Sequence, residues 1–569
     1  MSRSLTENSS VVRIRRLFWL LSVLLGFLQA WASRMTLVSD TVSYLDIGDC
    51  IWRGQWSAAV NGLWSPLFST VLGVVLGLFR PSPYWEYPLV HLIMFAIFVF
   101  ALWGFDFFLR ELILFRLENE SGEEFSIPAW VWLTIGYTLF LWASLRLIEV
   151  SETNPDMLVA AFFYFACGLL VRIRRSTAGW PAYLGFGLVL GLGYLTKSIM
   201  FPVSLICLAI AFAVGRRQAR RALGAVAVFL AVSGPFIVAL SVDRGRMTFG
   251  ESGRYNYAVH VNHVPRTHWQ GEIPGSGKPL HGTRQIFDRP ATFEFAGPLG
   301  GTYPAWSDPS YWYEGVQTRF DLGRAVGTEA RLLGVEIHFL FELQGSLIAG
   351  LFVMFYVGAR KWSALHDIST YWFLLLPSVS ALAMYALIHI ESRYLAPFIV
   401  TLVLCLFLSA KLPVSQESRR LCSSVAILLF AMFVCPIESP SMHLKDFARD
   451  IMGRSKPDPN SYQAMASEMY QLGLRPGDRI ASLEYSLYGM STWARLSRVM
   501  IVAEVYYWPS LSESLANDFW KADPATQRRV VQAIGETGAR VIVSQETPNP
   551  PDAPGWRRVG NTQYYAYWF

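Results

Sequence analysis

Long apolar segments recur along the chain and limit the folds that it can adopt. Hydrophobic residues make up 53% of the 569 residues and charged residues only 16%, well below the roughly 25% charge of soluble domains. A crossing of the hydrocarbon core takes about 17 to 25 apolar residues, or slightly fewer with polar flanks. Eleven segments fit, at 17–33, 87–109, 128–145, 157–171, 181–196, 199–215, 222–242, 343–359, 370–390, 394–410 and 421–437. They predict a mainly α, polytopic membrane protein.

The first apolar segment is expected to stay in the mature chain. Basic residues precede it in "VVRIRRLFWLLSVLLGFLQAWASR", as in a signal peptide, but it lacks a small-x-small cleavage site. Another apolar stretch, 66–79, begins with Pro66 and has 14 residues, which suits an interfacial or re-entrant helix rather than a crossing.

Basic residues in the short connections predict the orientation. With a cytoplasmic N-terminus and a non-crossing 66–79, eighteen Lys and Arg residues fall on the cytoplasmic side and six on the other. Because the basic residues form short clusters between apolar segments, the net charge of +6 has a topogenic origin, and no nucleic acid partner is expected.

Two long polar regions then lie outside the cytoplasm. The predicted organisation is a transmembrane module at 1–242, a loop at 243–342, further transmembrane helices at 343–437 and a domain at 438–569. Within this last region, "LGLRPGDRIASL" and "TGARVIVSQ" each join a helix end or turn to a short β-branched run. They predict a small C-terminal α/β domain.

No metal or disulfide framework is expected. The six cysteines are scattered without C-x-x-C spacing. His260, His263 and His268 have a spacing that fits no regular helix face and have no nearby Cys.

Three carboxylates follow the first apolar segment in "VSDTVSYLDIGDCIWRG". The apolar residues at 43–53 recur at helical spacing, so this stretch reads as an interfacial helix with Asp46, Asp49 and Arg53 on its solvated face. Asp40 precedes that helix at the membrane exit. We expect it to have a catalytic role, with a capping or solvated role as the alternative.

A second acidic group lies in "RLIEVSETNPDML", where Glu149, Glu152 and Asp156 share one short loop. One reading gives at least one of these acids a functional role. The other has Asp156 cap the helix that starts at Met157.

Three cations mark the ends of apolar segments on the predicted outer face: Arg146, Lys197 and Arg393. Charged groups at membrane depth are costly and often functional, although Lys and Arg also reach the interface by snorkelling. Acids and bases at one membrane face favour a site that deprotonates a hydroxyl and stabilises a departing phosphate.

Aromatic residues are concentrated in the loop segment "GGTYPAWSDPSYWYEG". Trp306, Trp312 and Tyr313 are candidates for stacking on a sugar or a polyprenyl chain, with an apolar mini-core as the alternative.

These residues resemble a family, the GT-C fold glycosyltransferases that use polyprenyl-phosphate sugars, which includes protein O-mannosyltransferases and bacterial aminoarabinose transferases. The similarity lies in order and spacing. Asp40 and Tyr44 match D-x-x-x-Y, "WSPLFSTVLGVVL" replaces H-P-P-L-Y, and "ETNPDMLVAAFF" supplies an acid before the fourth span. "LGYLTKSIMFP" resembles L-x-x-L-T-K-G-x-x-x-x-P, and "ESRYLAPF" a late R-Y-x-x-P segment. Trp64 stands where the family has its histidine, so that role is not carried over.

The resemblance implies an inverting sugar transfer on the outer face of the membrane, in bacteria the periplasmic face of the inner membrane. Asp40 would act as general base on an acceptor hydroxyl or help to bind a divalent cation, assisted by Glu149, Glu152 or Asp156. Lys197 and Arg393, together with Arg146, would hold the leaving lipid phosphate. Tyr44 joins the aromatic loop residues as a substrate contact. The acceptor is a glycan, a lipid or a protein.

Two other functions fit a chain with many spans. A lipid-linked glycan transporter or flippase would also place ions within the membrane, although transporters show repeated halves, and no internal repeat is evident here. A non-catalytic scaffold would bind glycan through the aromatic loop and the tail.

Overall fold

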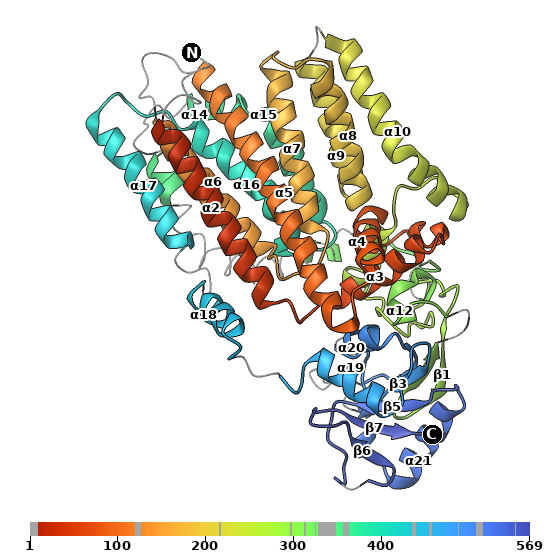
Figure 1. Cartoon of the computed structure of the whole chain (residues 1–569). Helices are drawn as coiled ribbons and strands as arrows, with labels where there is room; N and C mark the ends of the chain where they lie inside the picture. Colours follow the sequence, from red (N-terminus) through yellow and green to blue (C-terminus); the bar gives the residue numbers. More distant parts are fainter. Residues whose placement is uncertain are drawn as a thin grey trace. The chain divides into compact units, whose positions relative to one another are not determined.

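The chain folds into two compact units in a computed structural model (Figure 1). The described residues are 9–569 without 120–126, 216–217, 296, 298, 312–313, 322, 325, 328–348, 355, 357–362, 435–439, 455–457, 488, 508–515 and 552. The first unit comprises 1–32, 92–253 and 321–448, and the second comprises 33–91, 254–320 and 449–569.

Apolar helices build the first unit. They are α2 (Ser9–Ala32), most of α5 (Pro83–Glu118), α6 (Ala129–Trp142), the π-helical turn η2 (Ala143–Leu147), α7 (Asp156–Arg174), α8 (Trp180–Thr196), α9 (Met200–Val214), α10 (Ala219–Asp243), α14 (Ser363–Ser369), α15 (Trp372–Ala386), α16 (Ser392–Ser409) and α17 (Gln416–Val434). Helices α7, α8 and α9 lie side by side, as do α15 and α16 (Figure 1). The predicted apolar segments coincide with these helices, except that 343–359 lies mostly outside the described residues.

Four of the described helices are long and apolar enough to cross a membrane: α5, α7, α10 and α16. Shorter apolar helices are α4 (Pro66–Phe79), α8, α9 and α15. Several carry an internal proline, such as Pro377 in α15 and Pro397 in α16. Packing against neighbouring helices makes such prolines tolerable in membrane proteins. The mainly helical architecture, with helices apolar enough to cross a membrane, is confirmed, while eleven crossings stay a prediction.

Two helices of the second unit touch backbone to backbone. Helix α3 (Ser39–Trp52) packs on α4 through Gly48 and Gly73, and η1 (Trp56–Ala59) lies between them in sequence. A Cβ atom at Gly73 would lie 2.2 Å from the carbonyl oxygen of Gly48. Only glycine at these positions allows this approach.

A mixed sheet forms the rest of the second unit, with strand order β1-β2-β4-β3-β5-β7-β6. Its strands are β1 (Thr283–Phe287), β2 (Thr292–Phe295), β3 (Arg479–Ser482), β4 (Met500–Val505), β5 (Val541–Ser544), β6 (Trp556–Arg558) and β7 (Tyr565–Trp568). Strands β3, β4 and β5 are parallel, and the others pair antiparallel. The predicted strands in "GDRIASL" and "ARVIVSQ" are confirmed as β3 and β5.

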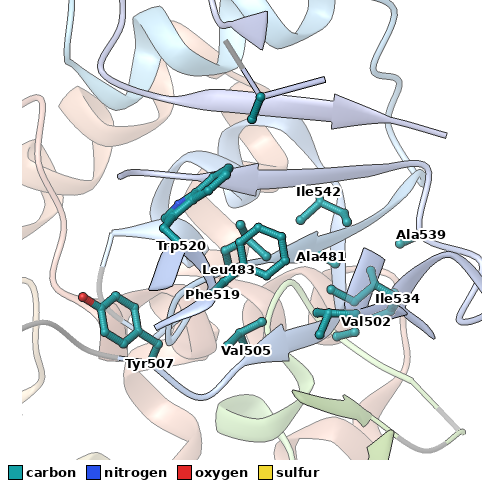
Figure 2. Packing of buried hydrophobic residues seen from close by; sticks show 13 residues of the cluster. Ala481, Leu483, Val502, Val505, Tyr507, Phe519, Trp520, Ile534, Ala539 and Ile542 are labelled. Atoms are coloured by element: carbon teal, nitrogen blue, oxygen red, sulfur yellow. The ribbon is translucent and has the colours of Figure 1, made fainter. Parts of the chain in front are cut away.

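The long polar loop contributes two strands to this sheet. Strand β2 pairs with β4 through Thr292 opposite Val505 and Glu294 opposite Ala503. The sequence predicts the polar loop and the C-terminal region as separate parts, but in the structure they share one sheet. Apolar residues such as Val502, Ile534 and Ile542 fill its core (Figure 2). Phe287 from β1 packs against this core.

Short helices complete the second unit. They are α11 (Ser252–His260), which continues from the first unit, α12 (Pro304–Ser307), η4 (Pro309–Tyr311), α18 (Pro440–Ile451), which also continues from the first unit, α19 (Tyr462–Gln471), α20 (Met490–Ser497), η6 (Phe519–Lys521) and α21 (Pro524–Gly535). Local sequence explains the start of α21. Asp523 accepts hydrogen bonds from the amides of Ala525 and Thr526, and Pro524 occupies the first helical position.

Candidate functional site

A buried carboxylate and a lysine meet in the first unit, at the ends of apolar helices. Asp156 opens α7 with an exposed fraction of 3%, and Lys197 follows the last residue of α8. The Nζ atom of Lys197 donates to Oδ1 of Asp156 at 2.6 Å. The ammonium also lies 3.5 Å from the centre of the Tyr394 ring, a cation–π contact.

Arg393 joins the same group from the first turn of α16. Its Nε atom lies 3.7 Å from Oδ2 of Asp156 and 2.5 Å from Oε2 of Glu391, and its Nη1 atom lies 3.8 Å from Oε2 of Glu152. Glu391 also accepts from Nε2 of His389 at 3.0 Å. The first unit thus brings together Asp156, Lys197, Arg393 and Glu152 of the predicted site. We call Asp156, Lys197, Glu391, Arg393 and Tyr394 the cation cluster.

Burial and charge act in opposite directions within the cation cluster. Burial lowers the pKa of Lys197, and the carboxylate of Asp156 opposes that shift. Burial by itself raises the pKa of Glu391, but hydrogen bonds from His389 and Arg393 outweigh it and hold the pKa at about 2. Glu391 therefore stays ionised at neutral pH and keeps Arg393 in place.

The loop before α7 has unusual backbone geometry. Arg146 lies in the π-helical turn η2, and Glu149 has a φ of +62°, in the left-handed region that non-glycine residues rarely adopt. Gln29 holds the loop, since its Nε2 donates to the carbonyl of Leu145 at 3.0 Å and its Oε1 accepts from the amide of Val150 at 2.9 Å. Glu149 accepts from Ser151 at 2.8 Å. Among described residues, neither Arg146 nor Glu149 has an ion-pair partner.

Asp40 lies in the second unit. It sits in the first turn of α3, which begins at Ser39, so the predicted helix start at residue 43 is wrong and Asp40 does not precede the helix. A carboxylate in the first turn is stabilised by the positive end of the helix dipole. The indole Nε1 of Trp306 donates to Oδ1 of Asp40 at 3.1 Å.

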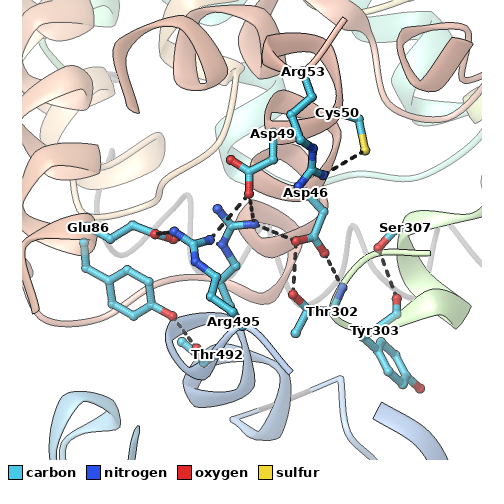
Figure 3. A network of polar contacts seen from close by, with 12 residues as sticks. Asp46, Asp49, Cys50, Arg53, Glu86, Thr302, Tyr303, Ser307, Thr492 and Arg495 are labelled. Atoms are coloured by element: carbon cyan, nitrogen blue, oxygen red, sulfur yellow. Dashed lines mark hydrogen bonds and ion pairs between the residues drawn. The ribbon is translucent and has the colours of Figure 1, made fainter. Parts of the chain in front are cut away.

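The predicted solvated face of α3 is wrong for Asp46, which is buried, while the Asp49 side chain is 31% exposed. Asp46 has an exposed fraction of 8%, and Nη1 of Arg495 in α20 lies 2.7 Å from Oδ1 of Asp46 and 2.7 Å from Oδ2 of Asp49 (Figure 3). Nε of Arg495 reaches Oε1 of the fully buried Glu86 at 2.8 Å. Helical phasing found the polar face of α3, but an arginine covers it where water was expected.

Of the aromatic candidates, Tyr44 and Trp306 lie within the described residues. Trp312 and Tyr313 lie outside the described residues. Trp306 is buried in the described part, and its carbonyl accepts from Nε1 of Trp64 at 3.1 Å. The ring of Tyr44 packs edge-to-face on Trp64, with centroids 4.9 Å apart. Trp64 therefore helps to hold the loop residue that contacts Asp40.

The described residues contain no group of three or more His, Cys, Asp or Glu side chains that would hold a metal ion. His268 has protein partners: its Nε2 lies 2.6 Å from Oε1 of Glu504, and its Nδ1 lies 3.2 Å from Oγ1 of Thr283. The indole of Trp306 donates to Asp40 and is not a metal ligand.

Several residues of both sites are absent from the sequence prediction. Glu391 and Tyr394 flank Arg393 in "HIESRYLAPF", so adjacency to a predicted cation was an available signal. Gln29, Glu86 and Arg495 lie far in sequence from their partners, and no local pattern marks them. Chemically, the cation cluster can hold an anion, and Asp40 can accept a proton.

No model of a protein family and no curated protein matches the sequence. Solved structures do match. The oligosaccharyltransferase AglB from Archaeoglobus fulgidus, in complex with an inhibitory peptide and a dolichol-phosphate, is 12% identical with a TM-score of 0.47, over 95% of this chain and 70% of that chain. ArnT from Cupriavidus metallidurans in the apo state is 14% identical with a TM-score of 0.40, over 98% of each chain. ArnT bound to undecaprenyl phosphate is 12% identical with a TM-score of 0.37, over 99% of this chain and 98% of that chain. All three structures are under 25% identical to this chain and have TM-scores below 0.5, so the likeness carries no argument about its function.

Proposed function

We propose that the chain is an integral membrane glycosyltransferase that moves a sugar from a polyprenyl-phosphate donor to an acceptor hydroxyl. The observation that carries the proposal is the cation cluster: Lys197 and Arg393 converge on the buried Asp156 at the ends of apolar helices. A lipid-linked phosphate has its charge at this depth, where the polyprenyl chain meets water. Charged groups at membrane depth are costly, and where they occur they often mark a functional site.

The cation cluster is suited to a leaving phosphate. A lysine ammonium has three N–H donors, and Asp156 accepts from one of them in the described structure. Asp156 and Glu391 fix the two cations before a ligand arrives, and such preorganised charge stabilises an anion that develops in the transition state. Arg146 is proposed as an additional cation for the same phosphate, and Glu149 and Glu152 as assisting acids.

Asp40 is proposed as the general base. Its carboxylate takes the proton of the acceptor hydroxyl while that oxygen attacks the anomeric carbon of the sugar. The bond from the anomeric carbon to the phosphate oxygen breaks, and the electron pair leaves with the lipid phosphate. Attack opposite the leaving group inverts the anomeric configuration. Tyr44, Trp306, Trp312 and Tyr313 are proposed to contact the sugar or lipid, and α3 and α4 to lie at the membrane interface.

The proposed location follows from the basic residues. The N-terminus is cytoplasmic, and the transfer site and the sheet lie on the opposite side, which in a bacterium is the periplasmic side of the inner membrane. The acceptor class, a glycan, a lipid or a protein, is left to experiment.

The test uses the full chain in proteoliposomes with radiolabelled polyprenyl-phosphate sugars and membrane extracts as acceptor source. We expect label transfer by the unaltered chain, and transfer at a much lower but measurable rate in Asp40→Asn. Asp478→Asn is the matched control, because Asp478 pairs with Arg540 at the partly exposed surface of the sheet region. Transfer by Asp40→Asn at the unaltered rate, with normal expression, would refute the role of Asp40. Translocation of the lipid-linked sugar without transfer would show that the chain is a flippase and not a transferase.

A further inference from the structure

Arg495 occupies an unusual position for an arginine of the sheet region. Its exposed fraction is 2%, and it contacts three carboxylates: Asp46 and Asp49 on α3, and Glu86 at the start of α5. A buried ion cluster contributes little net stability, because desolvation of the charges offsets their attraction. Such a cluster does fix the relative positions of its side chains, because a buried charge that moves away from its partner is left unpaired. Helix α20 is therefore tied to the helix that carries Asp40.

Asp46 links Arg495 to the polar loop. Oδ2 of Asp46 accepts from the amide of Thr302 at 2.6 Å, and Oδ1 accepts from the Thr302 hydroxyl at 3.0 Å (Figure 3). The preceding Gly301 has a φ of +71°, and a Cβ atom there would lie 2.9 Å from Oδ2 of Asp46. The backbone of the loop can approach this carboxylate because residue 301 is glycine.

The loop leads from Thr302 to Asp40 within four residues. The amide of Trp306 donates to the carbonyl of Tyr303 at 3.1 Å, in the turn that starts α12. The side chain of Trp306 then donates to Asp40, as described above. We call residues 302–306 the holding segment. It is attached at one end to Asp46 and at the other to Asp40, and both of these residues lie on α3.

We propose that Arg495 is a positioning residue for the proposed transfer reaction. Through Asp46 it fixes the holding segment, and the holding segment fixes the carboxylate of Asp40 through the indole of Trp306. The sheet region thereby sets the orientation of the proposed base without touching the substrate. This inference rests on the proposed function of Asp40 and adds to it a role for a residue 449 positions away from Asp46 in the sequence.

The test separates positioning from general stability. The assay uses the full chain in proteoliposomes. It compares four variants, each with and without Asp40→Asn: Arg495→Met, Arg495→Lys, Thr302→Val and Trp306→Phe. We expect Arg495→Met to lower kcat about tenfold or more while the KM for the donor changes less than about twofold, because small misplacements of a catalytic group are costly. Arg495→Lys restores part of the loss, because a lysine keeps the charge. In the Asp40→Asn background, Arg495→Met causes no further loss.

Thr302→Val and Trp306→Phe keep the ion cluster intact and carry the test if Arg495→Met fails to fold. Each removes one hydrogen bond of the holding segment and is expected to lower kcat with the same non-additivity toward Asp40→Asn. Arg540→Met is the control, since Arg540 is half-exposed and pairs with Asp478. Unaltered kcat in all the variants, or equal losses in both backgrounds, would overturn the positioning role alone. An unaltered rate in Asp40→Asn would overturn the proposed base as well.

Discussion

Lys197 and Asp156 form a 2.6 Å ion pair although 41 positions separate them in the sequence. Each lies at the end of an apolar helix, and the Tyr394 ring covers the ammonium. Asp156 has an exposed fraction of 3% and is held away from bulk water, whereas the Lys197 side chain is partly exposed, at 23%. Within this cluster Lys197 and Arg393 are fixed before any ligand binds.

The first prediction concerns donor binding. Lys197→Met removes a cation proposed to bind the lipid phosphate, and a charged hydrogen bond contributes about 1.5 to 3 kcal/mol. We expect the KM for the donor to rise about tenfold to a hundredfold, and Lys197→Arg to recover part of it. Lys411→Met is the matched control, because Lys411 forms a 3.0 Å pair with Asp367 that the proposal assigns no function. An equal rise in both methionine variants would contradict phosphate binding by Lys197.

The second prediction concerns the contact between α3 and α4. Gly73→Ala would place a methyl group 2.2 Å from the carbonyl oxygen of Gly48, so one helix must shift. Overpacking of this kind costs about 1 to 3 kcal/mol. Because α3 carries Asp40, we expect both a lower melting temperature in detergent and a lower kcat. Gly185→Ala in α8 is the control, as a Cβ atom there meets nothing within 4 Å. Wild-type melting and activity in Gly73→Ala would show that the two helices are not held so closely.

Local sequence predicts the helices well and the sheet only in part. Apolar segment lengths identify α7 and α16, and the β-branched runs after turns identify β3 and β5. Strands β1 and β2 are four or five residues long and lie in a polar loop. They pair with each other, but β2 joins the sheet by pairing with β4, about 200 residues later, and local pattern carries no information about such a tertiary contact.

The candidate site shows the same limit. Residues marked by a charge next to an apolar segment, such as Asp156, Lys197 and Arg393, do meet in the first unit. Helical phasing also identifies the polar face of α3. It cannot identify what covers that face, because Arg495 lies 449 positions away from Asp46 in the sequence. The sequence therefore predicts that Asp46 is exposed to solvent, whereas in the structure Asp46 is buried and paired with Arg495.

The third prediction concerns pH and the sheet. Burial raises the pKa of Glu484 to about 7, against hydrogen bonds from Ser544 and the amides after it, so the folded state binds this proton more tightly than the unfolded state does. The stability from this proton is fully present below about pH 4.5 and is lost as the pH rises to about 7, up to about 3 kcal/mol. Glu484→Gln mimics the protonated form. We expect its melting temperature, followed by tryptophan fluorescence, to exceed that of the unaltered chain at pH 8 but not at pH 4.5. Glu536→Gln on the surface is the control, and a Glu484→Gln gain that is equal at both pH values would contradict the shift.

The fourth prediction separates the two roles considered for Asp156. Asn154 lies just before the N-cap residue Pro155 of α7, and its Oδ1 accepts from the amide of Asp156 at 3.0 Å, while the Asp156 side chain faces Lys197. Asn154→Ala removes this one hydrogen bond and should lower stability by about 1 kcal/mol without changing the KM for the donor. Asp156→Asn should act on Lys197: Asp156 opposes the lowering of the Lys197 pKa by burial, so without its charge that pKa falls further. Lys197 then loses its proton at a lower pH. The neutral amine no longer attracts the phosphate of the donor, so donor binding weakens at a lower pH as well. Measured from pH 6 to 10, the rise of donor KM on the alkaline side should begin at lower pH in Asp156→Asn than in the unaltered chain, and should be absent in Lys197→Met. An unchanged alkaline limb in Asp156→Asn would mean that Asp156 does not set the charge of Lys197.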